Sequence, residues 1–152
     1  MTKRGWKKNP SCSFCVEKET SQHLFFICPI ARATWRAVAC MFGTDLCPNN
    51  LWQAYSWCHS FFPEGEVFHT VGIAAICWAI WNCRNRATFE FITLKNPSEC
   101  TFSACALLCY WAGLMKTQKD ADDLRTGATM LKESASRLMQ ICATAYQNDG
   151  AR

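Results

Sequence analysis

The chain has 152 residues, half of them apolar, which is enough to bury the core of one ordinary domain without disulfide bonds. Its basic N-terminus, Met1 to Lys8, is followed by Asn9 and Pro10 rather than by an apolar stretch, which excludes a secretory signal. The longest apolar run, Val71 to Trp81, has 11 residues, far short of the roughly 20 that span a membrane. We therefore expect an intracellular protein of the nucleus or cytoplasm, with no membrane partner.

Charge is unevenly distributed along the chain. Residues 1–36 carry seven lysines and arginines against two glutamates, a net charge of +5. The remaining 116 residues carry nine basic against ten acidic side chains, a net charge of −1. The N-terminal quarter is therefore the part that would attract a polyanion.

The first predicted elements are a turn and two helices. Pro10 to Cys15 is typical of a turn, and a short helix is expected from about Ser21 to Ile27. Pro29 suits the first turn of a second helix, which Gly43 ends. Apolar residues keep helical spacing between these two positions: Ile30, Ala33, Trp35, Val38 and Met41.

The rest of the chain also favours helices. A connector over 45–50 precedes helices expected over 51–62, 66–91, 98–116 and from about residue 124 onwards. The 66–91 segment is apolar nearly all round in its first half, which predicts a central helix with Trp78, Ile80 and Trp81 largely buried. The predicted fold is mainly α: a small zinc-binding N-terminal module, residues 1–42, followed by a tail of residues 43–152 that forms a bundle of four or five helices.

The module is predicted from four ligand-type residues in a short span. Cys12-x2-Cys15-x7-His23-x4-Cys28 offers three thiolates and an imidazole, a set that binds Zn²⁺ tetrahedrally. The alternative is coincidence in a chain with 12 cysteines. Zinc is favoured because these cysteines lie in a polar, loop-like stretch that core packing does not explain. Four protein ligands leave no position for a water, so we expect one structural ion.

The other thiols and imidazoles receive a different interpretation. Most of these cysteines lie on apolar helix faces, where a thiol acts as a small hydrophobe: Cys40, Cys58, Cys77, Cys83, Cys100, Cys105, Cys109 and Cys142. Cys105 and Cys109 are four residues apart, yet no histidine or second pair completes a site. His59 and His69 are single histidines in aromatic helices, where packing is favoured over ligation.

Two segments resemble a known family. Lys3-Arg4-Gly5-Trp6, the Cys-x2-Cys pair and Glu19-Thr20-x2-His23-Leu24-Phe25-x2-Cys28-Pro29-x-Ala31-x3-Trp35 resemble the zinc-binding domain of plant non-LTR (LINE-type) retrotransposon reverse transcriptases. Trp78-Ala79-Ile80-Trp81-Asn82-x-Arg84-Asn85-x3-Phe89 resembles the helical tail of the same polyproteins. The resemblance implies zinc ligands at Cys12, Cys15, His23 and Cys28, an origin in a mobile element and a role with nucleic acid.

No catalytic role is predicted. In the resembled polyproteins the polymerase precedes this module, whereas here Met1 falls just before the Lys-Arg-Gly-Trp segment, so we expect the catalytic portion to be absent. Asp120, Asp122 and Asp123 lack the flanking apolar strands of a polymerase site and suit a helix start instead. The expected protein is not an enzyme.

Two functions are compatible with these features. The first is binding of single-stranded RNA or DNA, with phosphates meeting Lys3, Arg4, Lys7 and Lys8 and a base stacking on Trp6. Phe14 and Phe25 are further aromatic candidates, although packing of the zinc module is favoured for both. The alternative is a zinc-stabilised scaffold that contacts a polymerase domain or another protein through its aromatic helices.

Overall fold

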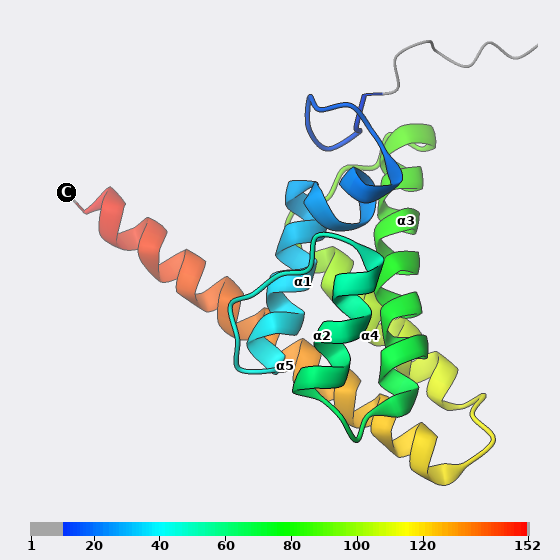
Figure 1. Cartoon of the computed structure of the whole chain (residues 1–152). Helices are drawn as coiled ribbons and strands as arrows, with labels where there is room; N and C mark the ends of the chain where they lie inside the picture. Colours follow the sequence, from blue (N-terminus) through cyan, green and yellow to red (C-terminus); the bar gives the residue numbers. More distant parts are fainter. Residues whose placement is uncertain (1–10, 152) are drawn as a thin grey trace, which may run out of the picture.

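The computed structural model describes residues 11–151, and every regular element in that range is helical (Figure 1). Its only bridge between extended residues joins Ser11 to Lys18, so the mainly α fold is confirmed. The elements are two π-helical turns and five α-helices: η1 (His23–Ile27), α1 (Pro29–Met41), α2 (Leu51–Phe61), η2 (Phe68–Gly72), α3 (Ile73–Phe89), α4 (Ser98–Ala112) and α5 (Gln118–Gly150).

The helix boundaries follow from capping residues that the sequence displays. Pro29 opens α1, and Gly43, with φ of 72°, takes the left-handed conformation just after that helix ends. The Asn50 side chain accepts a hydrogen bond from the backbone N–H of Gln53 at 2.8 Å and so caps α2. Thr117 caps α5 in the same way. The first four predicted α-helical segments begin where expected, but α5 begins at Gln118, before the expected start near residue 124, because Thr117 caps it.

The long helix expected over 66–91 is present and contains an unexpected π turn. The backbone is helical without interruption from residue 66 to residue 89, but η2 replaces the α-helical pattern over five residues. The fully buried Phe68 ring lies against Gly72 and Gly127, where an added Cβ would come within 2.7 and 3.0 Å of it. Two glycines thus let this ring fill the space between η2 and α5.

The core is formed mainly by packing against α5. This helix packs along α4 and also contacts α1 and η2, and its buried residues run from Ala121 to Ala135 (Figure 1). Beyond Leu138 its side chains are exposed, and the end of the helix extends away from the other helices. Asp120 lies in the first turn of α5, as predicted, rather than beside a strand.

Burial along α3 corrects one prediction. Ile80 is fully buried as expected, but Trp78 is 50% exposed and Trp81 is 38% exposed. The buried stripe of α3 takes Ile73, Ile76 and Ile80 at helical spacing, and both tryptophans fall outside it. Helix α3 therefore has a solvent-facing side although its sequence is apolar nearly all round, because only one side of the helix packs against α4.

Two further predictions need correction. Helix α4 ends at Ala112 rather than near residue 116, because the chain turns at residues 113–114. Cys58, Cys83, Cys100 and Cys105 are buried as expected, and Cys40 and Cys77 are half-buried. Cys109 and Cys142, however, are exposed because they lie on the outer faces of α4 and α5.

The division at residue 42 into a module and a tail stays a prediction. Apolar side chains from both sides of residue 42 belong to one core cluster, and α1 packs against both α4 and α5. Within residues 11–151, no helix combines the length and the apolar character that a membrane crossing needs.

Candidate metal centre

The first two predicted ligands are presented by a tight turn. The backbone N–H of Cys12 donates to the carbonyl of Glu17 at 2.9 Å, which closes the loop on itself. The backbone N–H of Phe14 points at the Cys12 sulfur at 3.4 Å. An N–H directed at a sulfur stabilises a thiolate, so this turn is already shaped as a metal-binding knuckle.

The other two predicted ligands bracket the π turn η1. The backbone N–H of His23 is held by the Thr20 hydroxyl at 3.0 Å, and that of Cys28 donates to the His23 carbonyl at 2.7 Å. This last bond spans five residues, the spacing of a π-helix. It brings residues 23 and 28 close enough to serve one ion, which is the reason for the irregular turn at this position.

The four side chains converge on one point. Their ligand atoms all lie within 4.8 Å of one another. The Cys12 and Cys28 sulfurs are 3.6 Å apart, and the Cys15 sulfur is 3.2 Å from Nε2 of His23. Zinc–sulfur bonds of about 2.3 Å in a tetrahedron place two sulfurs about 3.8 Å apart. The Cys12/Cys15/His23/Cys28 cluster is therefore suited to hold one zinc ion.

Burial makes this cluster unfavourable without a cation. Cys12, His23 and Cys28 are each at most 8% exposed. Burial, and to a smaller extent the neighbouring Cys12 thiol, raises the pKa of Cys28 to about 12. Without a metal ion, the Cys28 thiol therefore keeps its proton at neutral pH. A bound zinc ion displaces the proton and stabilises the thiolate. The donor set thus fits the metal and is poorly explained as core packing.

The number of ligands indicates the role of the ion. Three sulfurs and one ring nitrogen complete a tetrahedron, which leaves no position for a water or a substrate. The site therefore has the closed donor set of a structural zinc.

Residues 1–35 match the zf-RVT family, described as zinc-binding in reverse transcriptase. This is a zinc-binding rather than a catalytic domain, in agreement with the closed donor set. The zf-RVT match covers all four converging residues and ends at Trp35 in α1. Comparison with curated proteins and with solved structures gave no match.

Aromatic side chains anchor η1, which lies within the matched residues 1–35, to α1. The fully buried Trp35 ring stacks on Phe26 with centroids 5.5 Å apart, and its indole N–H donates to the Phe25 carbonyl at 2.7 Å. Phe14 and Phe25 are half-buried against the core, as favoured from the sequence. The predicted phosphate- and base-binding residues Lys3, Arg4, Trp6, Lys7 and Lys8 lie outside the described residues.

An ion pair that the sequence did not reveal joins the zf-RVT segment to α3. Arg84 Nη2 lies 2.6 Å from Oε1 of Glu19, and Arg84 Nε lies 3.1 Å from both carboxylate oxygens. The two side chains are only 17% and 12% exposed, and the guanidinium also packs against the Trp81 and Phe89 rings. Glu19 and Arg84 belong to the two segments that resemble the reverse transcriptase family. They are 65 residues apart in the chain, and nothing in the local sequence indicates that they are in contact.

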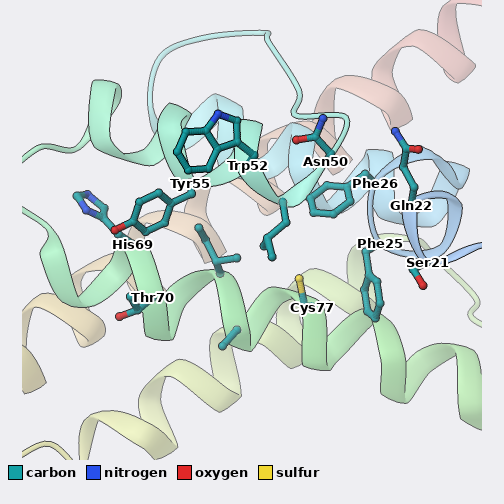
Figure 2. A pocket seen from close by; sticks show the side chains of 13 residues that line it. Ser21, Gln22, Phe25, Phe26, Asn50, Trp52, Tyr55, His69, Thr70 and Cys77 are labelled. Carbon is teal, nitrogen blue, oxygen red and sulfur yellow. The ribbon is translucent and has the colours of Figure 1, made fainter.

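A groove lies beside the zf-RVT segment, between η1, α2 and the η2–α3 helix (Figure 2). It has a volume of about 1120 Å³ and an apolar lining in which Phe25, Phe26, Trp52 and Tyr55 are the aromatic members. Trp52 is 76% exposed at its edge. Because η1 supplies one wall and its two ends carry His23 and Cys28, the groove depends on the ligand-bearing segment for its shape.

Proposed function

We propose that the protein is a non-catalytic remnant of a retrotransposon reverse transcriptase polyprotein that binds single-stranded nucleic acid. One observation carries the proposal: the chain's excess of positive charge lies in residues 1–36, which hold the zinc cluster and of which residues 1–35 match zf-RVT. The ion fixes residues 12–28, so the basic segment is joined to a rigid base rather than to a loose chain. A rigid support lowers the entropy lost when cations meet phosphates.

The described part of the module supports this proposal by its charge. Lys18, in the knuckle, and Arg36, on α1, are exposed, while Glu19 is neutralised by Arg84. Only Glu17 remains as an exposed acid in residues 11–36. Within residues 11–36, the exposed surface of the module therefore carries little acidic charge that would repel a phosphate backbone.

The test is the salt dependence of binding to a fluorescein-labelled single-stranded RNA. Changing Lys3, Arg4, Lys7 and Lys8 to alanine should weaken binding and flatten the slope of log K against log salt, by about 0.7 for each phosphate that is no longer neutralised. The matched control removes four exposed cations from the helical tail, Lys95, Lys116, Lys132 and Arg137, and should leave the slope nearly unchanged. Zinc content should stay the same in both variants, because none of the eight residues is a ligand.

Trp6 is tested in the same assay. Trp6→Ala should weaken binding by roughly 1–3 kcal/mol if the ring stacks on a base, without changing the salt slope. No detectable binding at low salt, or equal effects of the two four-alanine variants, would reject nucleic-acid binding.

The groove supports a second candidate, a zinc-stabilised scaffold for protein contacts. An apolar lining that includes exposed Trp52 and half-buried Phe25 is suited to an apolar segment of a polymerase domain or another protein. This candidate becomes the better one if the RNA assay shows no binding, because the described residues that line the groove include no lysine or arginine to meet a phosphate.

A further inference from the structure

His69 combines nearly complete burial with a ring nitrogen that has no partner among the described residues. It lies in the π turn η2 and is 2% exposed. Its Nε2 is 2.5 Å from the Phe62 carbonyl, and because a carbonyl only accepts, Nε2 carries the proton and donates it. Nδ1 therefore presents a lone pair, and within residues 11–151 no group donates to it.

A second imidazole packs against the His69 ring. His59, in the last turn of α2, has its ring centroid 4.0 Å from that of His69, with the ring planes inclined at 49°. The two rings make no hydrogen bond with each other in the structure. Because His59 is exposed, its ring can turn a nitrogen towards Nδ1 of His69 without disturbing the core.

We propose that His59 and His69 form a second metal site, which takes one divalent transition-metal ion that prefers nitrogen ligands. The His69 arrangement, with one ring nitrogen donating to a carbonyl and the other free, is the one that orients histidines in metal sites generally. Metal–nitrogen bonds of about 2.0–2.1 Å place two ligand nitrogens about 3 Å apart in a square or tetrahedral arrangement. Rings whose centroids are 4.0 Å apart can present nitrogens at that separation once the His59 ring turns.

The surroundings favour an ion that accepts nitrogen and oxygen ligands, such as nickel or copper. Cys58 is next to His59 in sequence, but it is fully buried, and burial raises the pKa of its thiol to about 12, so it remains protonated. The donor set is then two imidazoles with waters on the exposed side. Such a nitrogen and oxygen set binds Ni²⁺ and Cu²⁺ more tightly than earlier first-row ions, whereas the thiolate-rich cluster selects zinc.

One of the two proposed ligands, His69, lines one end of the groove. Figure 2 shows His69 next to Tyr55 at that end, with Phe25 and Ser21 at the opposite end. Tyr55 packs against the His59 ring with centroids 4.5 Å apart. An ion bound here would tie α2 to η2, the two elements that flank this end of the groove. The proposal is independent of nucleic-acid binding.

The experiment is a calorimetric titration of the zinc-loaded full chain with NiCl2, followed by metal analysis. Nickel is used because copper oxidises thiols, and the exposed cysteines are removed in all samples as Cys109→Ser and Cys142→Ser. We expect one Ni²⁺ per chain in addition to the zinc. His59→Gln should weaken this binding at least tenfold, and a control at another exposed position of α2, Ser56→Gln, should not.

A second measurement follows the imidazole signals by nuclear magnetic resonance. Paramagnetic Ni²⁺ should broaden the signals of His59 and His69 before those of His23. This measurement tests the role of His69 without a substitution at that buried position, which could prevent folding. Three results would overturn the proposal: no nickel binding beyond the zinc, binding that His59→Gln leaves intact, or nickel uptake matched by loss of zinc. The first of these results would mean that Nδ1 of His69 binds a water molecule and no metal ion.

Discussion

The zinc knuckle and the helical body are stabilised by different forces. In residues 11–28 the side chains that converge are polar, and the centre is formed by three thiols and an imidazole. In α3, α4 and α5 the convergent side chains are apolar, among them the fully buried Ile76, Leu108 and Leu131. The knuckle therefore depends on a ligand for its order, whereas the body depends on buried area.

The difference predicts that the two regions can be disrupted separately. Several contacts connect them, among them the stacking of Trp35 on Phe26, the Trp35 indole N–H donated to the Phe25 carbonyl and the Glu19–Arg84 ion pair. Removing the metal should release the knuckle and leave the body folded. Substitution of core residues in the helical body should lower its free energy of unfolding, while the four zinc ligands keep their ion.

The largest effect is expected from the ligands themselves. The double change Cys12→Ser and Cys15→Ser should reduce zinc from about one ion per chain to none, because two of four ligands are removed. Zinc supplies about 10–16 kcal/mol of apparent folding energy in small zinc-finger modules, so amides of residues 12–28 should lose hydrogen-exchange protection while those of α5 keep theirs. Zinc is measured by mass spectrometry and protection by hydrogen exchange.

A matched control uses two cysteines outside the cluster. Cys109→Ser and Cys142→Ser remove the same number of thiols from exposed positions and should leave the zinc content unchanged. Full retention of metal by the Cys12→Ser, Cys15→Ser chain would contradict the assignment of the ligands.

The next effect concerns α3 and compares its two faces. Ile80→Ala removes a fully buried side chain and should lower the free energy of unfolding by about 2–5 kcal/mol. Trp78→Ala removes a larger side chain that is half exposed and should cost about 2 kcal/mol, below the roughly 3–5 kcal/mol of a fully buried tryptophan. Guanidinium denaturation measures both. A loss of about 4 kcal/mol or more for Trp78→Ala would mean that Trp78 is buried in solution, against the structure.

The smallest effect is expected at the connection between the regions. Glu19→Gln leaves the partly buried Arg84 without its carboxylate and should cost about 1–2 kcal/mol, with faster exchange of the knuckle amides. The control pair, Lys119 with Asp123, has its lysine 74% exposed to solvent, so Asp123→Asn should leave the free energy of unfolding nearly unchanged. Loss of zinc from the Glu19→Gln chain would show that the ion pair also supports the site.

Local sequence signals were sufficient for most helix starts and for the ligand set. Pro29, Asn50 and Thr117 each act through neighbours within one turn, so their effect is visible in the sequence. The four zinc ligands fall within 17 residues, and their spacing alone restricts the chemistry to a closed metal site.

Predictions failed where the outcome depended on packing between distant segments. Trp78 and Cys109 lie in apolar sequence, and no local pattern says that these positions face away from the neighbouring helix. The π turn η2 likewise depends on how the Phe68 ring fits between Gly72 and Gly127. Both outcomes are set by shape complementarity between elements.

The sequence by itself thus determined the helical class, most helix starts and the identity of the zinc cluster, because capping, periodicity and ligand spacing are interactions over a few residues. Only the tertiary structure decided that Arg84 pairs with Glu19, that His59 lies beside His69 and that a groove opens next to η1. These features join residues that are distant in the chain or on different helices. Their contacts exist only after burial of the core has fixed how the helices are packed.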